Sequence, residues 1–91
     1  TLLPSKVSIS QNYPNPFNGE TSLSISLSEE VSLTLVVYNA LGVRVTTIAD
    51  GRFPAGQYSF NWNGARVPSG IYFARLFAER VDKTVKMLLL K

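Results

Sequence analysis

The chain has 91 residues, of which 45% are hydrophobic and 16% are charged, and it carries a formal net charge of +3. This length and composition predict one small folded domain and exclude both a second domain and a disordered tail. The sequence contains no cysteine and no histidine, which excludes disulfides, thiolate metal sites and the commonest general base of enzymes. We therefore expect a non-catalytic domain that needs no cofactor and no metal.

A proline-rich run near the start is the first conspicuous segment. Each proline fixes its own φ and biases the preceding residue toward extended backbone, so the run cannot be helical. Asparagine side chains close local turns. We predict an ordered bend that braces the domain through residues 11–17, with Tyr13 and Phe17 as its apolar anchors. Residues 1–5 are expected to end a linker. The run consists of Gln11, Asn12, Tyr13, Pro14, Asn15, Pro16, Phe17 and Asn18.

Apolar and polar residues alternate with period two along most of the chain, which is typical of half-buried β-strands. One predicted strand, over residues 43–48, has poorly sorted faces and indicates a β-bulge. Asp50 and Gly51 are expected to begin the loop after it. We predict an all-β, immunoglobulin-like antiparallel sandwich of about seven strands, with a barrel as the alternative. The strands are expected over 7–10, 22–27, 31–37, 43–48, 57–62, 71–77 and 83–90.

With no disulfide between the sheets, apolar side chains must hold the sandwich together. Tyr58, Phe60 and Trp62 share one face of their strand; an exposed row of this kind would bind carbohydrate. Three large residues opposite a polar face are, however, the usual inner face of a strand. The predicted core consists of Leu33, Leu35, Tyr58, Phe60, Trp62, Tyr72, Leu76, Val85 and Met87.

The last predicted strand combines an apolar anomaly with the surplus positive charge. If Met87 and its alternating neighbours face inward, Leu88 and Leu90 stand on the solvent side. The N-terminal segment or a neighbouring domain could cover these leucines, or a partner could read them as an apolar and basic strip, by strand addition or groove docking. The lysines could equally protect a sheet edge. The positive and negative charges up to residue 74 cancel. The surplus of positive charge lies after it, where the acidic residues Glu79 and Asp82 are outnumbered by Arg75, Arg80, Lys83, Lys86 and Lys91.

Six collinear motifs resemble the type A C-terminal sorting domain of the type IX secretion system. The resemblance covers nearly the whole chain. One departure is Gly19, where that family usually continues with proline, so the turn is expected to be looser there. The motifs are the run from Gln11 to Asn18, Val37 to Gly42, Ala55 to Tyr58, Trp62 to Gly64, Ser69 to Phe73 and Lys86 to Lys91.

The resemblance implies that residues 6–91 form an immunoglobulin-like sorting domain at the end of a larger exported protein. It implies passage through the periplasm to the cell surface or beyond. The implied partners are export machinery in the outer membrane, an upstream cargo domain in the same chain and an anionic surface polysaccharide, with no nucleic acid and no transmembrane segment. The residues implied to be read by that machinery are Lys86, Met87, Leu88, Leu89, Leu90 and Lys91.

Two other functions remain open at this point. The immunoglobulin-like domain of flagellar hook-capping proteins is similar in its sandwich and in several turn motifs, and it implies a structural role as a spacer or assembly module. A carbohydrate-binding module is the second alternative. It requires a row of aromatic rings that is exposed to solvent.

Overall fold

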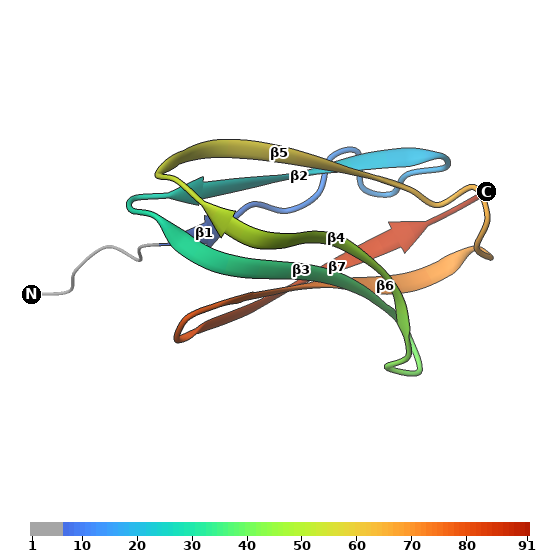
Figure 1. The fold of residues 1–91 in the computed structure, drawn as a ribbon. Helices are drawn as coiled ribbons and strands as arrows, with labels where there is room; N and C mark the ends of the chain where they lie inside the picture. The colour runs from blue at the N-terminus through green and yellow to red at the C-terminus, as the bar shows by residue number, and fades with distance from the viewer. Residues whose placement is uncertain (1–6) are drawn as a thin grey trace, which may run out of the picture.

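Between residues 7 and 91, seven antiparallel strands in two sheets form the domain (Figure 1). The computed structural model describes residues 7–91, so the linker predicted for residues 1–5 lies outside the described residues. One sheet, sheet A, has the strand order β1-β2-β5, and the other, sheet B, has the order β4-β3-β6-β7. The prediction of an all-β sandwich is confirmed. The strands are β1 (Val7–Ile9), β2 (Glu20–Leu27), β3 (Val31–Asn39), β4 (Arg44–Phe53), β5 (Gly56–Asn63), β6 (Gly70–Ala78) and β7 (Val81–Leu89).

The alternation of the sequence places one apolar face of each sheet against the other. Along β2, Leu23, Ile25 and Leu27 are buried while the intervening Ser24 and Ser26 are exposed. A strand with this pattern has to lie with its apolar face on the core, since its two faces differ so strongly. Of the nine predicted core residues, seven are buried: Leu33, Leu35, Trp62, Tyr72, Leu76, Val85 and Met87.

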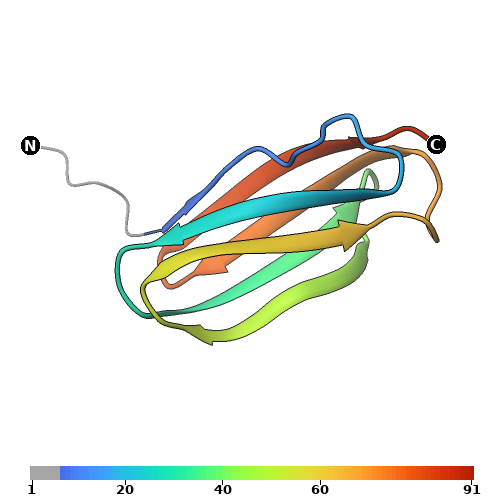
Figure 2. The same ribbon diagram turned by 90° about the horizontal axis from the view of Figure 1, so that it is seen from above.

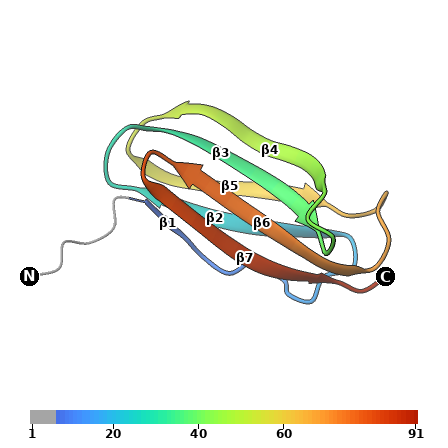
Figure 3. The same ribbon diagram turned by 90° about the horizontal axis from the view of Figure 1, so that it is seen from below.

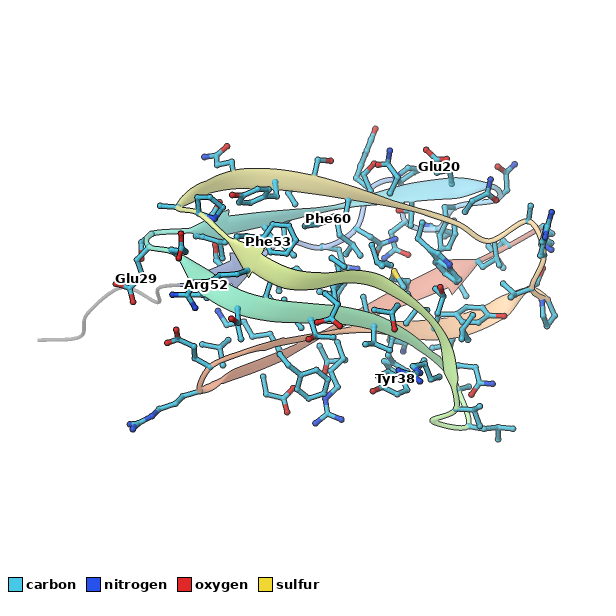
Figure 4. All side chains as sticks on the ribbon, in the orientation of Figure 1. Glu20, Glu29, Tyr38, Arg52, Phe53 and Phe60 are labelled. Carbon is cyan, nitrogen blue, oxygen red and sulfur yellow. The ribbon has the colours of Figure 1, made fainter. Side chains whose placement is uncertain are left out.

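The other two predicted core residues lie at the open side of the sandwich, between β4 and β5. Tyr58 and Phe60 are half-buried and pack against the core. Phe53 of β4 contacts both rings edge to face, with centroid distances of 5.3 Å and 5.8 Å. Figure 4 shows Phe53 and Phe60 between the two layers. These rings and the buried Trp62 therefore face inward, and β5 does not present the exposed row that a sugar platform requires.

β4 is longer and more irregular than predicted. Its pairing with β3 skips Ile48 and Val45, so the strand contains two bulges. This confirms the bulge that its mixed faces indicated. The prediction of a loop at Asp50 and Gly51 is wrong, because both residues pair with β3 and the strand continues to Phe53. A glycine after an aspartate is a common turn signal, but here the strand pairing prevails.

The two ends of the sandwich carry different connections. One end holds the turns β2–β3, β4–β5 and β6–β7; the other holds the β3–β4 turn, the β5–β6 loop and the C-terminus (Figures 1 and 3). The β3–β4 turn is fixed by Asn39, whose Oδ1 accepts hydrogen bonds from the N–H groups of Leu41 and Val43 at 2.9 Å and 3.0 Å. Gly42 adopts φ +82 in this turn, a left-handed conformation that favours glycine.

Candidate recognition site on the last strand

β7 is an edge strand of sheet B, and its side chains point alternately into the core and into solvent. Val85, Met87 and Leu89 are buried. Between and after them, Lys86 is exposed, Leu88 is half-buried and Leu90 is 52% exposed. The predicted alternation is thus confirmed. Of the six residues expected to be read by a partner, Met87 and Leu89 belong to the core, and the outward side chains are those of Lys86, Leu88, Leu90 and Lys91.

The proline-rich run lies along the free edge of β7 (Figures 2 and 3). Phe17 donates its N–H to the Leu88 carbonyl at 3.0 Å and accepts the Leu90 N–H at 2.8 Å. Asn15 Oδ1 accepts the Leu88 N–H at 3.0 Å, and Gln11 Nε2 donates to the Lys86 carbonyl at 2.7 Å. The outward backbone groups of Leu88, the Lys86 carbonyl and the Leu90 N–H are therefore occupied. A foreign strand cannot pair with this half of the edge, so a partner can read only side chains there.

Buried polar contacts hold the bend itself together. The Asn12 side chain is buried; its Nδ2 donates to Thr21 Oγ1 at 2.9 Å and to the Pro14 carbonyl at 3.2 Å. Thr21 Oγ1 also donates to the Pro14 carbonyl, at 2.8 Å. Buried polar groups are tolerated when each finds a partner, and these do. The bonds from Tyr13 to Pro14 and from Asn15 to Pro16 are both cis, which the sequence did not predict.

Phe17 anchors the bend in the core, whereas Tyr13 does not. The Phe17 ring is 3% exposed and contacts Trp62 edge to face, with ring centroids 5.7 Å apart. Trp62 in turn contacts Tyr72 of sheet B at 5.2 Å. Tyr13 pairs with Ser22 through its backbone, but its side chain is 81% exposed. The prediction of two apolar anchors is therefore right for Phe17 and wrong for Tyr13.

Gly64 provides the space in which Phe17 and Leu89 meet. A Cβ at Gly64 would lie 2.8 Å from Leu89 Cδ2 and 3.3 Å from Phe17 Cε2. We expect Gly64→Ala to destabilise the domain by about 1 to 3 kcal/mol, because the added methyl group overpacks this contact. The measurement is urea unfolding. Gly19→Ala is the matched control: a Cβ there meets nothing within 4 Å, so an equal loss in both variants would contradict the expectation.

The residues after β7 are fastened to the β5–β6 loop. The Lys91 N–H donates to Ser69 Oγ at 2.9 Å, and Lys91 Nζ donates to the Ala65 carbonyl at 2.7 Å. Tyr72 supports the same loop, because its hydroxyl donates to the Pro68 carbonyl at 2.6 Å. The Lys91 ammonium group is thus engaged within the domain. Of the outward residues between Lys86 and Lys91, the apolar surface that a partner can reach comes from Leu88 and Leu90, and the positive charge comes mainly from Lys86.

Part of the positive charge of the last hairpin is neutralised locally. Arg75 forms two hydrogen bonds with the Asp82 carboxylate, at 2.9 Å and 2.6 Å, and its guanidinium lies 4.5 Å from the Phe77 ring centroid. These hydrogen bonds lower the pKa of Asp82, so the ion pair is present at neutral pH and is lost only as the pH falls through that lowered value. Lys83 Nζ donates to the Val7 carbonyl at 2.9 Å. Lys86 is therefore the cation that lies beside the outward leucines.

Two further properties concern metal binding and membranes. Within residues 7–91, no group of three or more Asp or Glu side chains is arranged to hold a metal ion. The described part of the chain contains no helix that is long and apolar enough to cross a membrane. Of the acidic residues described, Glu30 forms an ion pair with Arg52 and Asp82 forms one with Arg75.

The sequence assigned no partner on β7 to any single residue of the bend. The side chains of Gln11 and Asn15 both reach this strand, more than 70 residues away. Leu41 and Val43 of the β3–β4 turn were predicted as parts of a motif and of a strand but not as exposed apolar residues, and they are 88% and 57% exposed. Two aliphatic residues on either side of a turn glycine were the signal in the sequence that could have indicated this exposed apolar pair.

The comparison with known proteins places this sandwich in a family. Residues 10–80 match the FlgD Ig-like domain family, a stretch that begins just before the proline-rich run and ends in the turn before β7. No curated protein and no solved structure matched the chain. The matched region contains the bend, strands β2 to β6 and the cross-sheet contact between Trp62 and Tyr72. The chain therefore belongs to the FlgD Ig-like domain family.

Proposed function

We propose that this domain is a non-catalytic sorting module of the type IX secretion system, read by the outer-membrane export machinery. The observation that carries the proposal is the arrangement of β7. Lys86, Leu88 and Leu90 point outward from an edge strand whose neighbouring backbone groups are already bonded to the bend. The six sequence motifs that resemble type A sorting domains give further support. Cargo activity then belongs to an upstream domain of the same protein.

The geometry favours recognition through side chains rather than through strand addition. Strand addition needs free backbone donors and acceptors along an edge, and the bend occupies those of β7 from the Lys86 carbonyl to the Leu90 N–H. Leu88 and Leu90 offer apolar surface, and Lys86 adds positive charge at the same edge. A receptor with a small apolar groove and an acidic border would fit this strip. The proposed route leads through the periplasm to the cell surface, where an anionic polysaccharide is a further proposed partner.

A reporter fusion tests the proposal directly. The side chains of Lys86, Leu88 and Leu90 form the outward strip of β7. The triple variant Lys86→Ser, Leu88→Ser and Leu90→Ser removes this strip and leaves the buried Met87 and Leu89 in place. We expect surface delivery to fall about tenfold or more in a host with this secretion system, because burying one leucine is worth about 1.5 to 3 kcal/mol and 1.4 kcal/mol is tenfold. The reporter should accumulate in the periplasm.

The control for this experiment changes outward residues of the other sheet. Gln57 and Ser59 are exposed on β5, and the variant Gln57→Ser with Ser59→Ala should be delivered like the wild type. Melting temperatures of the purified domains show whether each variant still folds. Full surface delivery of the triple variant would refute the sorting function.

The family match favours a second candidate, a structural immunoglobulin-like module that acts in an assembly. The match ends at Arg80, one residue before β7 begins. The sandwich, rather than the outward side chains of β7, would therefore carry this function. The triple variant separates the two candidates. A structural module predicts normal export of the triple variant, and it predicts that the parent protein assembles only when the sandwich is folded.

A further inference from the structure

The large exposed apolar side chains of the described residues gather mainly at one end of sheet B. Leu41 and Val43 lie in and beside the β3–β4 turn, Ile71 begins β6 and Leu90 follows β7. All four are exposed. The fifth such residue, Tyr13, bridges to β2 of the other sheet. Contiguous exposed apolar surface on a small protein indicates an interaction site more often than a solvated face.

Strand register joins these residues to the outward strip of β7. Leu88 pairs with Ile71 on β6, so the two side chains are neighbours on one face. The next outward row crosses all four strands of sheet B. In order it contains Lys86, Phe73, Tyr38 and Arg44. Figure 4 shows Tyr38 on the face of sheet B that points away from sheet A.

This face is hollowed and is bordered by positive charge. A depression of about 420 Å³ is lined by Tyr38, Gly42, Phe73, Arg75, Asp82 and Thr84. Its single acid, Asp82, is paired with Arg75, while Arg44 and Lys86 are exposed at the two ends of the aromatic row. Aromatic and arginine side chains are the residue types that dominate binding energy in protein interfaces.

We propose that the partner of this domain reads the outer face of sheet B as one continuous surface, from Leu90 on β7 to Leu41 in the β3–β4 turn. This inference rests on the proposed sorting function and assigns its recognition site to three further elements: β6, β3 and the β3–β4 turn. The occupant is a protein surface with an apolar centre and an acidic border. Leu41, Val43, Ile71 and Leu90 are aliphatic, and they suit a protein better than a glycan or nucleic acid, whose rings stack on aromatic side chains.

The β3–β4 turn allows this surface to be tested without disturbing the fold. Asn39 Oδ1 holds the turn through the backbone N–H groups of Leu41 and Val43, and their side chains point into solvent. Serine at both positions keeps the backbone donors and removes the apolar groups. Two aliphatic side chains that the fold does not require are therefore available for a partner.

The test uses the same reporter fusion as above, in a host with the type IX system. We expect Leu41→Ser with Val43→Ser to lower surface delivery on the order of tenfold, the size expected when interface anchors are lost, with an unchanged melting temperature. Arg44→Glu should also lower delivery, and Arg44→Lys should restore it. Tyr13→Ser is the control: Tyr13 is 81% exposed and lies in the bend, where it bridges to β2 of the other sheet, so its replacement should not affect delivery.

The outcomes separate this inference from the proposed function. Wild-type delivery of the Leu41→Ser, Val43→Ser variant, together with failed delivery of the β7 triple variant, would overturn the extended surface and leave the sorting function in place. Normal delivery of both variants would overturn both. An equal loss with Tyr13→Ser would also count against the inference, because it would show that any exposed apolar residue matters.

Discussion

Phe17→Ala is expected to cost about 3 to 5 kcal/mol in the free energy of unfolding, the usual range for removing a buried aromatic ring. The ring is 3% exposed and contacts Trp62, so its loss leaves a cavity between the bend and the core. The backbone bonds from Phe17 to Leu88 and Leu90 also lose their anchor, because the ring fixes the position of the bend. A domain of this size has a total stability of about 5 to 15 kcal/mol, so the variant should lose a large fraction of the stability of the domain.

Urea unfolding, followed by the fluorescence of Trp62, measures this effect. Tyr13→Ala is the control in the same run of residues, and its effect should stay within about 0.5 kcal/mol because the side chain is exposed. A melting temperature that does not change with Phe17→Ala would show that the bend does not brace the sandwich. The proline-rich run would then need another role, such as direct contact with a partner.

Leu89→Ala and Leu90→Ala should affect different properties although the residues are adjacent: the first should lower stability, and the second should lower delivery. Leu89 is fully buried next to Phe17 and Gly64, and we expect its truncation to cost about 2 to 5 kcal/mol. Leu90 points into solvent, so its truncation should change stability by less than about 0.5 kcal/mol. Delivery of a surface reporter should be reduced by Leu90→Ala in a domain that is still fully folded.

This pair separates a folding defect from a recognition defect. The free energy of unfolding and the surface delivery are measured for both variants, so that stability and export are compared residue by residue. If Leu90→Ala destabilised the domain as strongly as Leu89→Ala, the outward orientation of Leu90 would have no functional meaning. If it changed neither property, the outward strip would not extend to residue 90.

Strand positions could be predicted well because the two faces of this sandwich differ so sharply in polarity. Serines alternate with leucine and isoleucine along β2, and only one orientation buries the apolar set. The same reasoning placed Met87 inside and Leu90 outside. It failed at Asp50 and Gly51, because the pairing of β4 with β3 overrode a local turn signal.

The sequence predicted that the proline-rich run braces the domain, but the individual contacts of the brace could not be predicted, because they join distant parts of the chain. Nothing in the spacing of Gln11 and Asn15 indicates that their amide groups reach β7. Likewise, a tyrosine and a phenylalanine in one proline-rich run look equivalent in the sequence, yet only Phe17 lies beside Trp62. The outer face of sheet B could not be predicted either, since Tyr38, Phe73 and Arg44 come together only through the register of two strand pairs.

The hydrogen bonds between the bend and β7 have a consequence for biosynthesis. Residues 11 to 17 are synthesised before their partners between Lys86 and Leu90, which follow more than 70 residues later. Contacts with such long sequence separation form late in folding. An unfinished chain therefore holds Phe17 without its neighbours from β7, and the closed sandwich exists only once translation has passed Leu90. Synthesis of β7, closure of the sandwich and presentation of the outward leucines thus become a single event.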